Sequence, residues 1–166
     1  WEELLAAAPP GACFVSSPAH LTRIPPMDPL PKERAAPVIF TAGGPLPFDA
    51  AQASAAAFGP LPTEVYGSTE TGGVAHRQQR DPKTPFTPLP GMQTRVDERG
   101  LLSVKSRYTE GGDWDATNDI ADRLPDGGFI LSGRANQFVK IEGKRISLAE
   151  VEKYLSCSAL VKEAAA

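Results

Sequence analysis

The sequence predicts an α/β fold class: a parallel strand-helix-strand sheet portion, then a small antiparallel, barrel-like β subdomain, then the start of an α+β C-terminal domain. Residues 37–66 read as apolar strand, glycine turn, helix and apolar strand, which is typical of a parallel sheet. Residues 92–132 hold pairs of short strands joined by turns, which indicates antiparallel hairpins. Residues 138–155 read as strand, turn and helix.

The N-terminal part alternates helices and strands. A helix is predicted over residues 1–8, before a Pro-Pro-Gly turn, and the apolar run 12–16 suits a buried strand. Five prolines from residue 25 to residue 37 predict an extended surface connection, because proline does not fit a helix interior. The parallel portion follows, with a strand, a helix and a strand at 37–41, 48–58 and 61–66.

The middle of the chain carries two hairpin signals after a polar, proline-rich stretch at 77–90. The first hairpin joins strands 92–97 and 101–106 through an Asp-Glu-Arg-Gly turn. The second joins strands 120–124 and 128–132 around Pro-Asp-Gly.

A capping box marks the last predicted helix, which runs from residue 148 to about residue 155. Ser147 precedes the helix and Glu150 follows three residues later. These two side chains can each accept a hydrogen bond from a backbone amide at the helix start, so the helix is predicted to begin there.

Composition argues against two classes of partner. The net charge is −3 and Lys and Arg are scattered without a basic run, so we expect no nucleic-acid binding. No apolar run approaches the length of about 20 residues that a membrane span needs, and no signal-peptide pattern opens the chain. Cys13 and Cys157 have no metal-ligand spacing, which favours a reduced, cytoplasmic protein in which both cysteines are buried.

The most informative segment places hydroxyls and one carboxylate on a glycine-flanked turn. It follows a predicted strand, at the edge where parallel sheets bind ligands. Glycine lets backbone approach a ligand, hydroxyls donate to phosphate oxygens, and a carboxylate suits Mg²⁺. An ordinary polar turn is the alternative. The segment is Tyr66-Gly67-Ser68-Thr69-Glu70-Thr71-Gly72-Gly73.

Four segments, in order and together covering nearly the whole chain, resemble the adenylate-forming superfamily. This superfamily comprises acyl- and aryl-CoA synthetases, nonribosomal peptide adenylation domains and luciferases. Each segment alone is a weak signal, whereas the ordered set is specific. The segments are residues 41–46 (TAGGPL), 66–72 (YGSTETG), 114–119 (WDATND) with the strand through Gly128 and Phe129, and 133–152, which opens with Gly-Arg.

The resemblance implies a two-step reaction that uses ATP and Mg²⁺. A fatty or aryl carboxylic acid attacks the α-phosphate to form an acyl-adenylate, and a phosphopantetheine thiol of CoA or of an acyl carrier protein then takes the acyl group. The first step brings two anions together, which a cation and hydrogen-bond donors make tolerable. Two alternatives stay open: a catalytically inactive nucleotide-binding or interaction module that keeps the fold, and a chance match to an unrelated phosphate-binding enzyme.

The same resemblance assigns the candidate site residues. Thr69 binds a phosphate oxygen and Glu70 holds the Mg²⁺, so these two form the catalytic pair. The other cofactor-binding residues near them are Gly43 and Gly44, which line the adenine and acyl pocket, Tyr66 beside the purine, and Gly67 and Ser68 in the turn.

Asp119 and Arg134 complete the predicted cofactor site. Two acceptor oxygens suit two ribose hydroxyls, so Asp119 is the implied ribose ligand, although Asn118 stands where the family has Gly. Arg134 is the implied arginine near ribose and phosphate. From the local sequence alone, a solvated turn acid and a surface arginine are the alternatives.

The resemblance also predicts the domain organisation. Residues 1–134 are the C-terminal part of a large adenylation domain, with a parallel portion (1–76) and an antiparallel portion (77–134), and residues 135–166 are the hinge and the start of a small C-terminal domain. Asn136 stands at the hinge where the family has Asp. Both ends read as interrupted elements, and the family's phosphate loop and late lysine do not occur in the sequence. We therefore expect a fragment that alone binds nucleotide weakly and does not catalyse adenylation.

Overall fold

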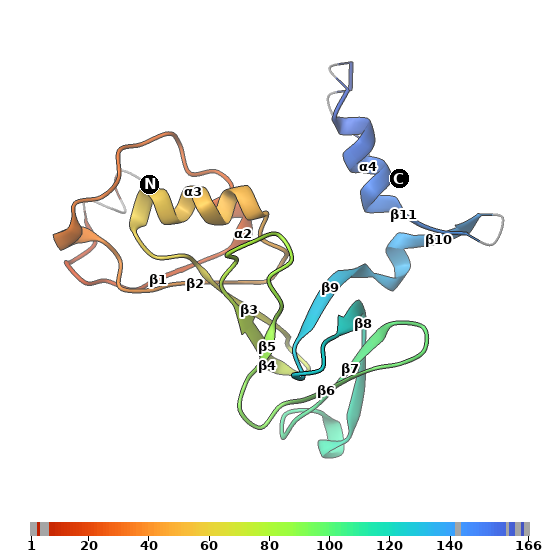
Figure 1. Cartoon of the computed structure of the whole chain (residues 1–166). Helices are drawn as coiled ribbons and strands as arrows, with labels where there is room; N and C mark the ends of the chain where they lie inside the picture. The colour runs from red at the N-terminus through yellow and green to blue at the C-terminus, as the bar shows by residue number, and fades with distance from the viewer. Residues whose placement is uncertain (1–2, 4–6, 142–143, 159, 162–163, 165–166) are drawn as a thin grey trace.

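The computed structural model describes residues 3, 7–141, 144–158, 160, 161 and 164. These residues form a five-stranded sheet, a four-stranded sheet and a two-stranded sheet, in that order along the chain (Figure 1). The predicted α/β fold class is confirmed. The helix predicted over residues 1–8 lies largely outside the described residues.

The five-stranded sheet is mixed. Its first three strands are parallel, with Ser16 beside Thr41 and Ala42 beside Val65, whereas the fourth and fifth strands are antiparallel to their neighbours. In order across the sheet, the strands are β1 (Phe14–Ser16), β2 (Ile39–Ala42), β3 (Thr63–Ser68), β4 (Gly72–Arg77) and β5 (Thr87–Pro88).

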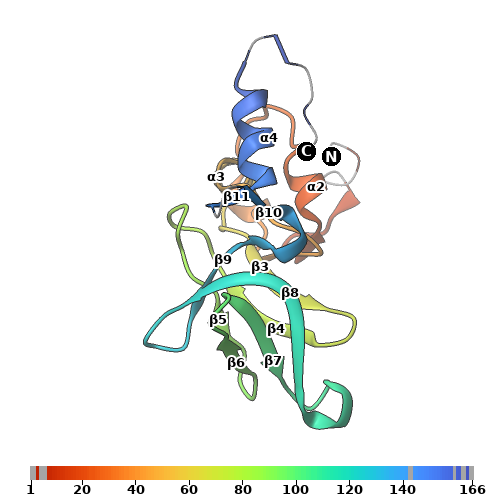
Figure 2. The same cartoon turned by 90° about the vertical axis from the view of Figure 1, so that its right-hand side faces the viewer.

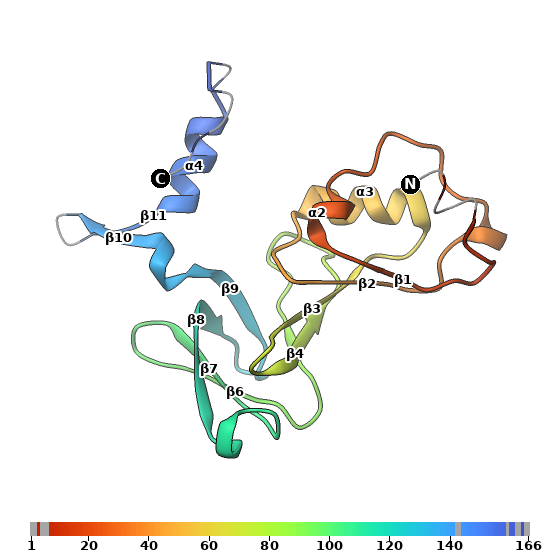
Figure 3. The same cartoon turned by 180° about the vertical axis from the view of Figure 1, so that it is seen from behind.

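One face of the parallel strands is covered by helices. The alanine-rich helix α3 (Phe48–Phe58) connects β2 to β3, and the short helix α2 (Pro18–Leu21) follows β1. Figures 1 and 3 show both helices on the same side of β1 and β2. The buried side chains beneath them are Leu21, Ala36, Ile39, Leu46, Ala50, Ala51, Ala57 and Phe58. The 3₁₀ turn η1 (Lys32–Arg34) lies in the proline-rich connection.

The four-stranded sheet is antiparallel throughout. Its strands, in spatial order, are β6 (Gln93–Val96), β7 (Leu101–Lys105), β8 (Trp114–Arg123) and β9 (Phe129–Arg134), with the 3₁₀ turn η2 (Glu110–Gly112) before β8. Its pairing shifts register between Ile120 and Ala121, and Figure 2 shows β8 arching across the sheet. Such irregularities bend a strand and curl the sheet.

A shared apolar core joins the mixed sheet to the curled sheet. Phe86 and Phe129 stack with ring centroids 5.7 Å apart, and their backbones exchange two hydrogen bonds of 2.8 and 3.0 Å. Val74 and Ala75 of β4 pack with these rings and with Leu102, Val104 and Ala121 of the curled sheet. This junction fixes where the end of β3 lies relative to β8 and β9.

The C-terminal residues form η3 (Ala135–Gln137), the hairpin of β10 (Phe138–Ile141) and β11 (Lys144–Ser147), and helix α4 (Leu148–Ser156). The helix begins directly after Ser147, as the capping box predicts. Within the described part of the chain, none of the helices is both long and apolar enough to cross a bilayer.

Some features differ from the sequence-based expectations. The region 138–155, read as strand, turn and helix, contains a second strand, β11, before the helix. Strand β4 begins at two glycines that read as a turn, so the pattern does not reveal it. The strand predicted at 120–124 is the end of the longer β8. Cys13 and Cys157 are both exposed, so the prediction that they are buried is wrong.

Candidate functional site

The candidate site lies at the ends of two neighbouring parallel strands. Since Ala42 pairs with Val65, the exposed Gly43 and Gly44 that follow β2 lie at the same edge as the end of β3. Gly43 has a φ of +89°, which a side chain rarely adopts. Carboxyl ends of parallel strands are where α/β sheets bind ligands.

The turn between β3 and β4 is closed by a reciprocal set of hydrogen bonds. The Ser68 amide donates to the Thr71 hydroxyl at 3.1 Å, and the Thr71 amide donates to the Ser68 hydroxyl at 3.2 Å. The two hydroxyls lie 3.1 Å apart, and the Thr71 hydroxyl also donates to the Gly72 carbonyl at 3.1 Å. These hydrogen bonds therefore join the two ends of the turn, Ser68 and Thr71, to each other.

Residue 67 must be glycine because the backbone at the start of β4 passes very close to it. An ideal Cβ at this position would lie 2.1 Å from the Gly72 carbonyl oxygen and 3.0 Å from Cα of Gly73. The pairing of β3 with β4 also shifts register between Tyr66 and Gly67. A side chain here would push the two strands apart, so glycine sets the geometry of the turn.

Thr69 and Glu70, at the tip of this turn, are exposed. A hydrogen bond from the Ser68 side chain, followed by one from the Glu70 backbone, lowers the pKa of the Glu70 carboxyl below its ordinary value of 4.5. The carboxylate is thus ionised at neutral pH and faces solvent. Among the described residues, no three His, Cys, Asp or Glu side chains gather as a metal site, so Glu70 offers a single carboxylate. That donor set fits Mg²⁺, which binds one or two carboxylates together with substrate phosphates.

The second half of the site brings together three of the predicted residues. The Tyr66 hydroxyl donates to Oδ2 of Asp119 at 2.6 Å, and Nε of Arg134 lies 3.4 Å from Oδ1 of Asp119. Asp119 and Arg134 are register partners on β8 and β9. The Asp119 amide donates to the Thr117 hydroxyl at 3.2 Å, which steadies the strand at this point.

Tyr66 connects the first half of the site, which is the turn at residues 68–71 with Gly43 and Gly44, to the second half, which is Asp119 with Arg134. Its ring packs on Phe86 and Phe129, with centroids 5.8 and 5.6 Å away, while its hydroxyl reaches Asp119. Burial first, and then the hydrogen bond to Asp119, raises the pKa of Tyr66 above its ordinary value of 10.0, so the phenol stays protonated. Because Tyr66 directly precedes Gly67 on β3, its anchored ring ties the turn to the Asp119 carboxylate.

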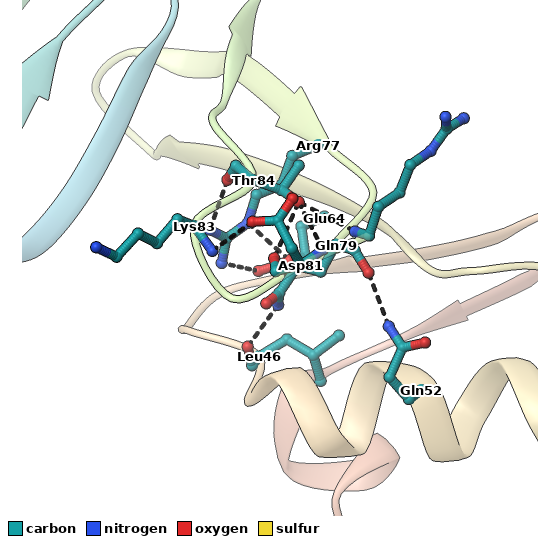
Figure 4. A network of polar contacts seen from close by, with 9 residues as sticks. Leu46, Gln52, Glu64, Arg77, Gln79, Asp81, Lys83 and Thr84 are labelled. Atoms are coloured by element: carbon teal, nitrogen blue, oxygen red, sulfur yellow. Dashed lines mark hydrogen bonds and ion pairs between the residues drawn. The ribbon is translucent and has the colours of Figure 1, made fainter.

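A buried polar network, which the sequence does not predict, supports the first half of the site (Figure 4). Arg77 binds both oxygens of Glu64, at 2.9 and 3.1 Å. The Gln79 side-chain amide donates to Glu64 and to the Leu46 carbonyl, both at 2.7 Å, and Gln52 of α3 donates to the Gln79 carbonyl at 2.8 Å. The network therefore fastens the loop after Gly44 to strands β3 and β4.

Comparisons with known proteins find relatives among ligases and synthases. A 4-coumarate–CoA ligase of Cereibacter sphaeroides is 33% identical over 112 residues, which are 67% of this chain and 25% of that ligase. Phenyloxazoline synthase MbtB of a Mycobacterium species is 34% identical over 124 residues, 75% of this chain and 9% of the synthase. The chain belongs to the adenylate-forming superfamily.

The solved structures agree with this membership at the level of the fold. ATP-bound MatB from Rhodopseudomonas palustris superposes with a TM-score of 0.73 over 98% of this chain and 38% of MatB, at 22% identity. No protein-family model matches the sequence. The chain thus spans about a quarter of the length of the ligase and well under half of the solved structure.

Proposed function

We propose that this chain supplies the nucleotide-facing wall of an enzyme that activates a carboxylic acid with ATP and transfers the acyl group to a thiol. The cluster of Tyr66, Asp119 and Arg134 at the edge that also carries the residue 68–71 turn is the observation that carries this proposal. The relatives are a CoA ligase and a synthase, and one structural neighbour holds ATP, which supports the assignment.

The ribose end is formed by Asp119. Its two carboxylate oxygens have lone pairs beyond those that face Tyr66 and Arg134, and vicinal ribose hydroxyls can donate to them. Tyr66 holds the carboxylate in place, and Gly43, Gly44 and the tyrosine ring form the surface beside the purine. The exposed Arg134 side chain can reach from the ribose to a phosphate oxygen.

The phosphate end is formed by the turn. Thr69 donates to a phosphate oxygen, and the ionised Glu70 is placed to hold Mg²⁺, which when bound offsets the negative charge of the phosphates. The acid's oxygen bonds to the α-phosphorus and pyrophosphate leaves. In the second step the thiol loses its proton to solvent water, its sulfur bonds to the acyl carbon, and AMP leaves with the bonding electron pair. These residues lower the barrier by stabilising charge.

Substrate and acceptor are the finer parts of the proposal. In the part of the chain that the structure describes, no acidic side chain stands out to pair with the amine of an amino acid. We therefore propose a fatty or aryl acid as substrate, with CoA or an acyl carrier protein as acceptor. The reaction would take place in the cytoplasm. Residues 1–134 would belong to the large domain and residues 135–166 to the hinge and the small domain.

ATP–pyrophosphate exchange with a panel of aryl and medium-chain acids tests the proposal in the whole protein. We expect acid-dependent exchange that falls at least about tenfold in Asp119→Ala and Glu70→Gln, the equivalent of ~1.4 kcal/mol in transition-state binding. Glu98→Gln, on the exposed turn between β6 and β7, is the matched control and should retain wild-type exchange.

Two outcomes would contradict the proposal. Binding of ATP without exchange on any acid would favour the catalytically inactive module. Exchange by the 166 residues alone would contradict the expectation that other parts of the enzyme are needed for chemistry. Thioester formation, followed with CoA and with a phosphopantetheinylated carrier protein in parallel, identifies the acceptor.

A further inference from the structure

Thr71 is buried at the end of an otherwise exposed turn. The residue is 2% exposed, whereas Ser68, Thr69 and Glu70 are all exposed. A buried hydroxyl costs free energy unless it is hydrogen-bonded. The hydrogen-bond partners of the Thr71 hydroxyl therefore indicate which groups it holds in place.

Each bonding capacity of the Thr71 hydroxyl is used inside the turn. It donates to the Gly72 carbonyl at 3.1 Å and accepts from the Ser68 amide at 3.1 Å. The Ser68 hydroxyl, 3.1 Å away, is the remaining neighbour, and it also accepts from the Thr71 amide at 3.2 Å. Together these bonds fix residues 68 and 71 relative to each other, and residues 69 and 70 are the two that span the gap.

We propose that Thr71 is a positioning residue for the phosphate and metal end of the site, and this inference rests on the function proposed above. Holding Thr69 and Glu70 in one backbone conformation before ligand arrives removes part of the ordering cost of binding. Thr71 itself does not touch the nucleotide. It acts through Ser68, to which it is joined at the other end of the turn.

Two substitutions separate the hydroxyl from the bulk of the side chain. Thr71→Val keeps the shape and removes the hydroxyl, whereas Thr71→Ser keeps the hydroxyl and removes the methyl group. In the whole protein, Thr71→Val should raise the half-saturating Mg²⁺ concentration for ATP–pyrophosphate exchange, and the Kd for Mg·ATP, by about tenfold. Thr71→Ser should stay within about threefold of wild type, since a serine hydroxyl can make the same bonds.

A merely structural role predicts a different pattern. It would lower the denaturation midpoint of both variants and leave the Mg²⁺ dependence unchanged. That pattern, or a Thr71→Ser variant as impaired as Thr71→Val, would overturn the inference. Thr71→Ala removes both the hydroxyl and the methyl group, so if the valine variant does not fold, the difference between Thr71→Ala and Thr71→Ser gives the effect of the hydroxyl. A wild-type protein without Mg·ATP-dependent exchange would overturn the proposed function as well, so the two failures are distinguishable.

Discussion

The Tyr66 hydroxyl donates a 2.6 Å hydrogen bond to Asp119, which lies 53 residues further along the chain on a different sheet. Tyr66 lies on the strand that leads into the candidate phosphate turn, and Asp119 is the candidate ribose ligand. The bond exists because Phe86 and Phe129 join the two sheets beneath the tyrosine ring. The two halves of the site are therefore positioned by one packing arrangement.

Tyr66→Phe tests this bond through pH. The raised pKa of Tyr66 means that the folded protein keeps the phenol proton where the unfolded chain has lost it. The resulting stabilisation is complete below pH 10 and is lost as the pH rises above 10. We expect the free energy of unfolding to fall more steeply above pH 10 in wild type than in Tyr66→Phe, and to be about 1–2 kcal/mol lower in the variant at pH 8. Urea denaturation across this range measures both, and parallel pH profiles would contradict the assignment.

Removing one partner of the buried Glu64–Arg77 ion pair should strongly destabilise the mixed sheet. Its side chains are only 5% and 12% exposed, and Arg77 also lies 4.3 Å from the centroid of the Phe86 ring. Arg77→Met leaves a buried carboxylate without its cation, so we expect a loss of about 3–5 kcal/mol in urea denaturation.

The Lys105–Asp113 pair provides the matched control. Its atoms are 4.0 Å apart and its side chains are 40% and 81% exposed. Lys105→Met should cost less than about 1 kcal/mol, because solvent screens the pair. Equal losses in the two variants would show that burial does not decide the strength of these pairs.

The elements that the sequence predicts are those whose cause is local. Helix α3 and strands β2, β3, β6 and β7 follow from apolar periodicity and turn residues within a few positions. Strand β4 does not, because its first residues are glycines that normally read as a turn. They form a strand here because β4 pairs with β3 and packs Val74 and Ala75 on the curled sheet. Those packing contacts are distant in sequence, so the local pattern does not reveal them.

The candidate site also contains some residues that the local sequence predicts and others whose position depends on distant contacts. Gly43, Gly44 and the turn at residues 68–71 can be placed at one edge because neighbouring parallel strands end together. The contact of Tyr66 with Asp119 depends on how two sheets pack, and the buried Glu64 depends on partners far away in sequence. Thr71 belongs to the motif, but the sequence does not predict that it is buried, since three exposed polar residues precede it.

Gly67→Ala should disrupt the turn, whereas Gly44→Ala should be tolerated. The added methyl at residue 67 meets the Gly72 carbonyl oxygen at 2.1 Å, and this backbone atom cannot move away without separating β3 from β4. At residue 44 the nearest atom is a Pro18 side-chain carbon at 4.0 Å. We expect the free energy of unfolding, measured by denaturation, to fall by about 1–3 kcal/mol or more in Gly67→Ala and by under about 0.5 kcal/mol in Gly44→Ala. A stable Gly67→Ala protein with protected β3 and β4 amides would contradict the close approach.

Ser68→Ala should raise the pKa of the Glu70 carboxyl. A hydrogen bond to the charged form holds this pKa below 4.5, so its stabilising effect is present above pH 4.5 and is lost as the pH falls through the lowered value. Without the serine hydroxyl, the pKa should move up towards 4.5, and metal-dependent nucleotide binding should weaken at a higher pH than in wild type. Side-chain NMR titration of Glu70 measures the shift directly. Thr69→Val leaves the Ser68 hydroxyl in place and should keep the pKa low, so an equal rise in both variants would show that the turn as a whole, rather than Ser68, sets the charge of Glu70.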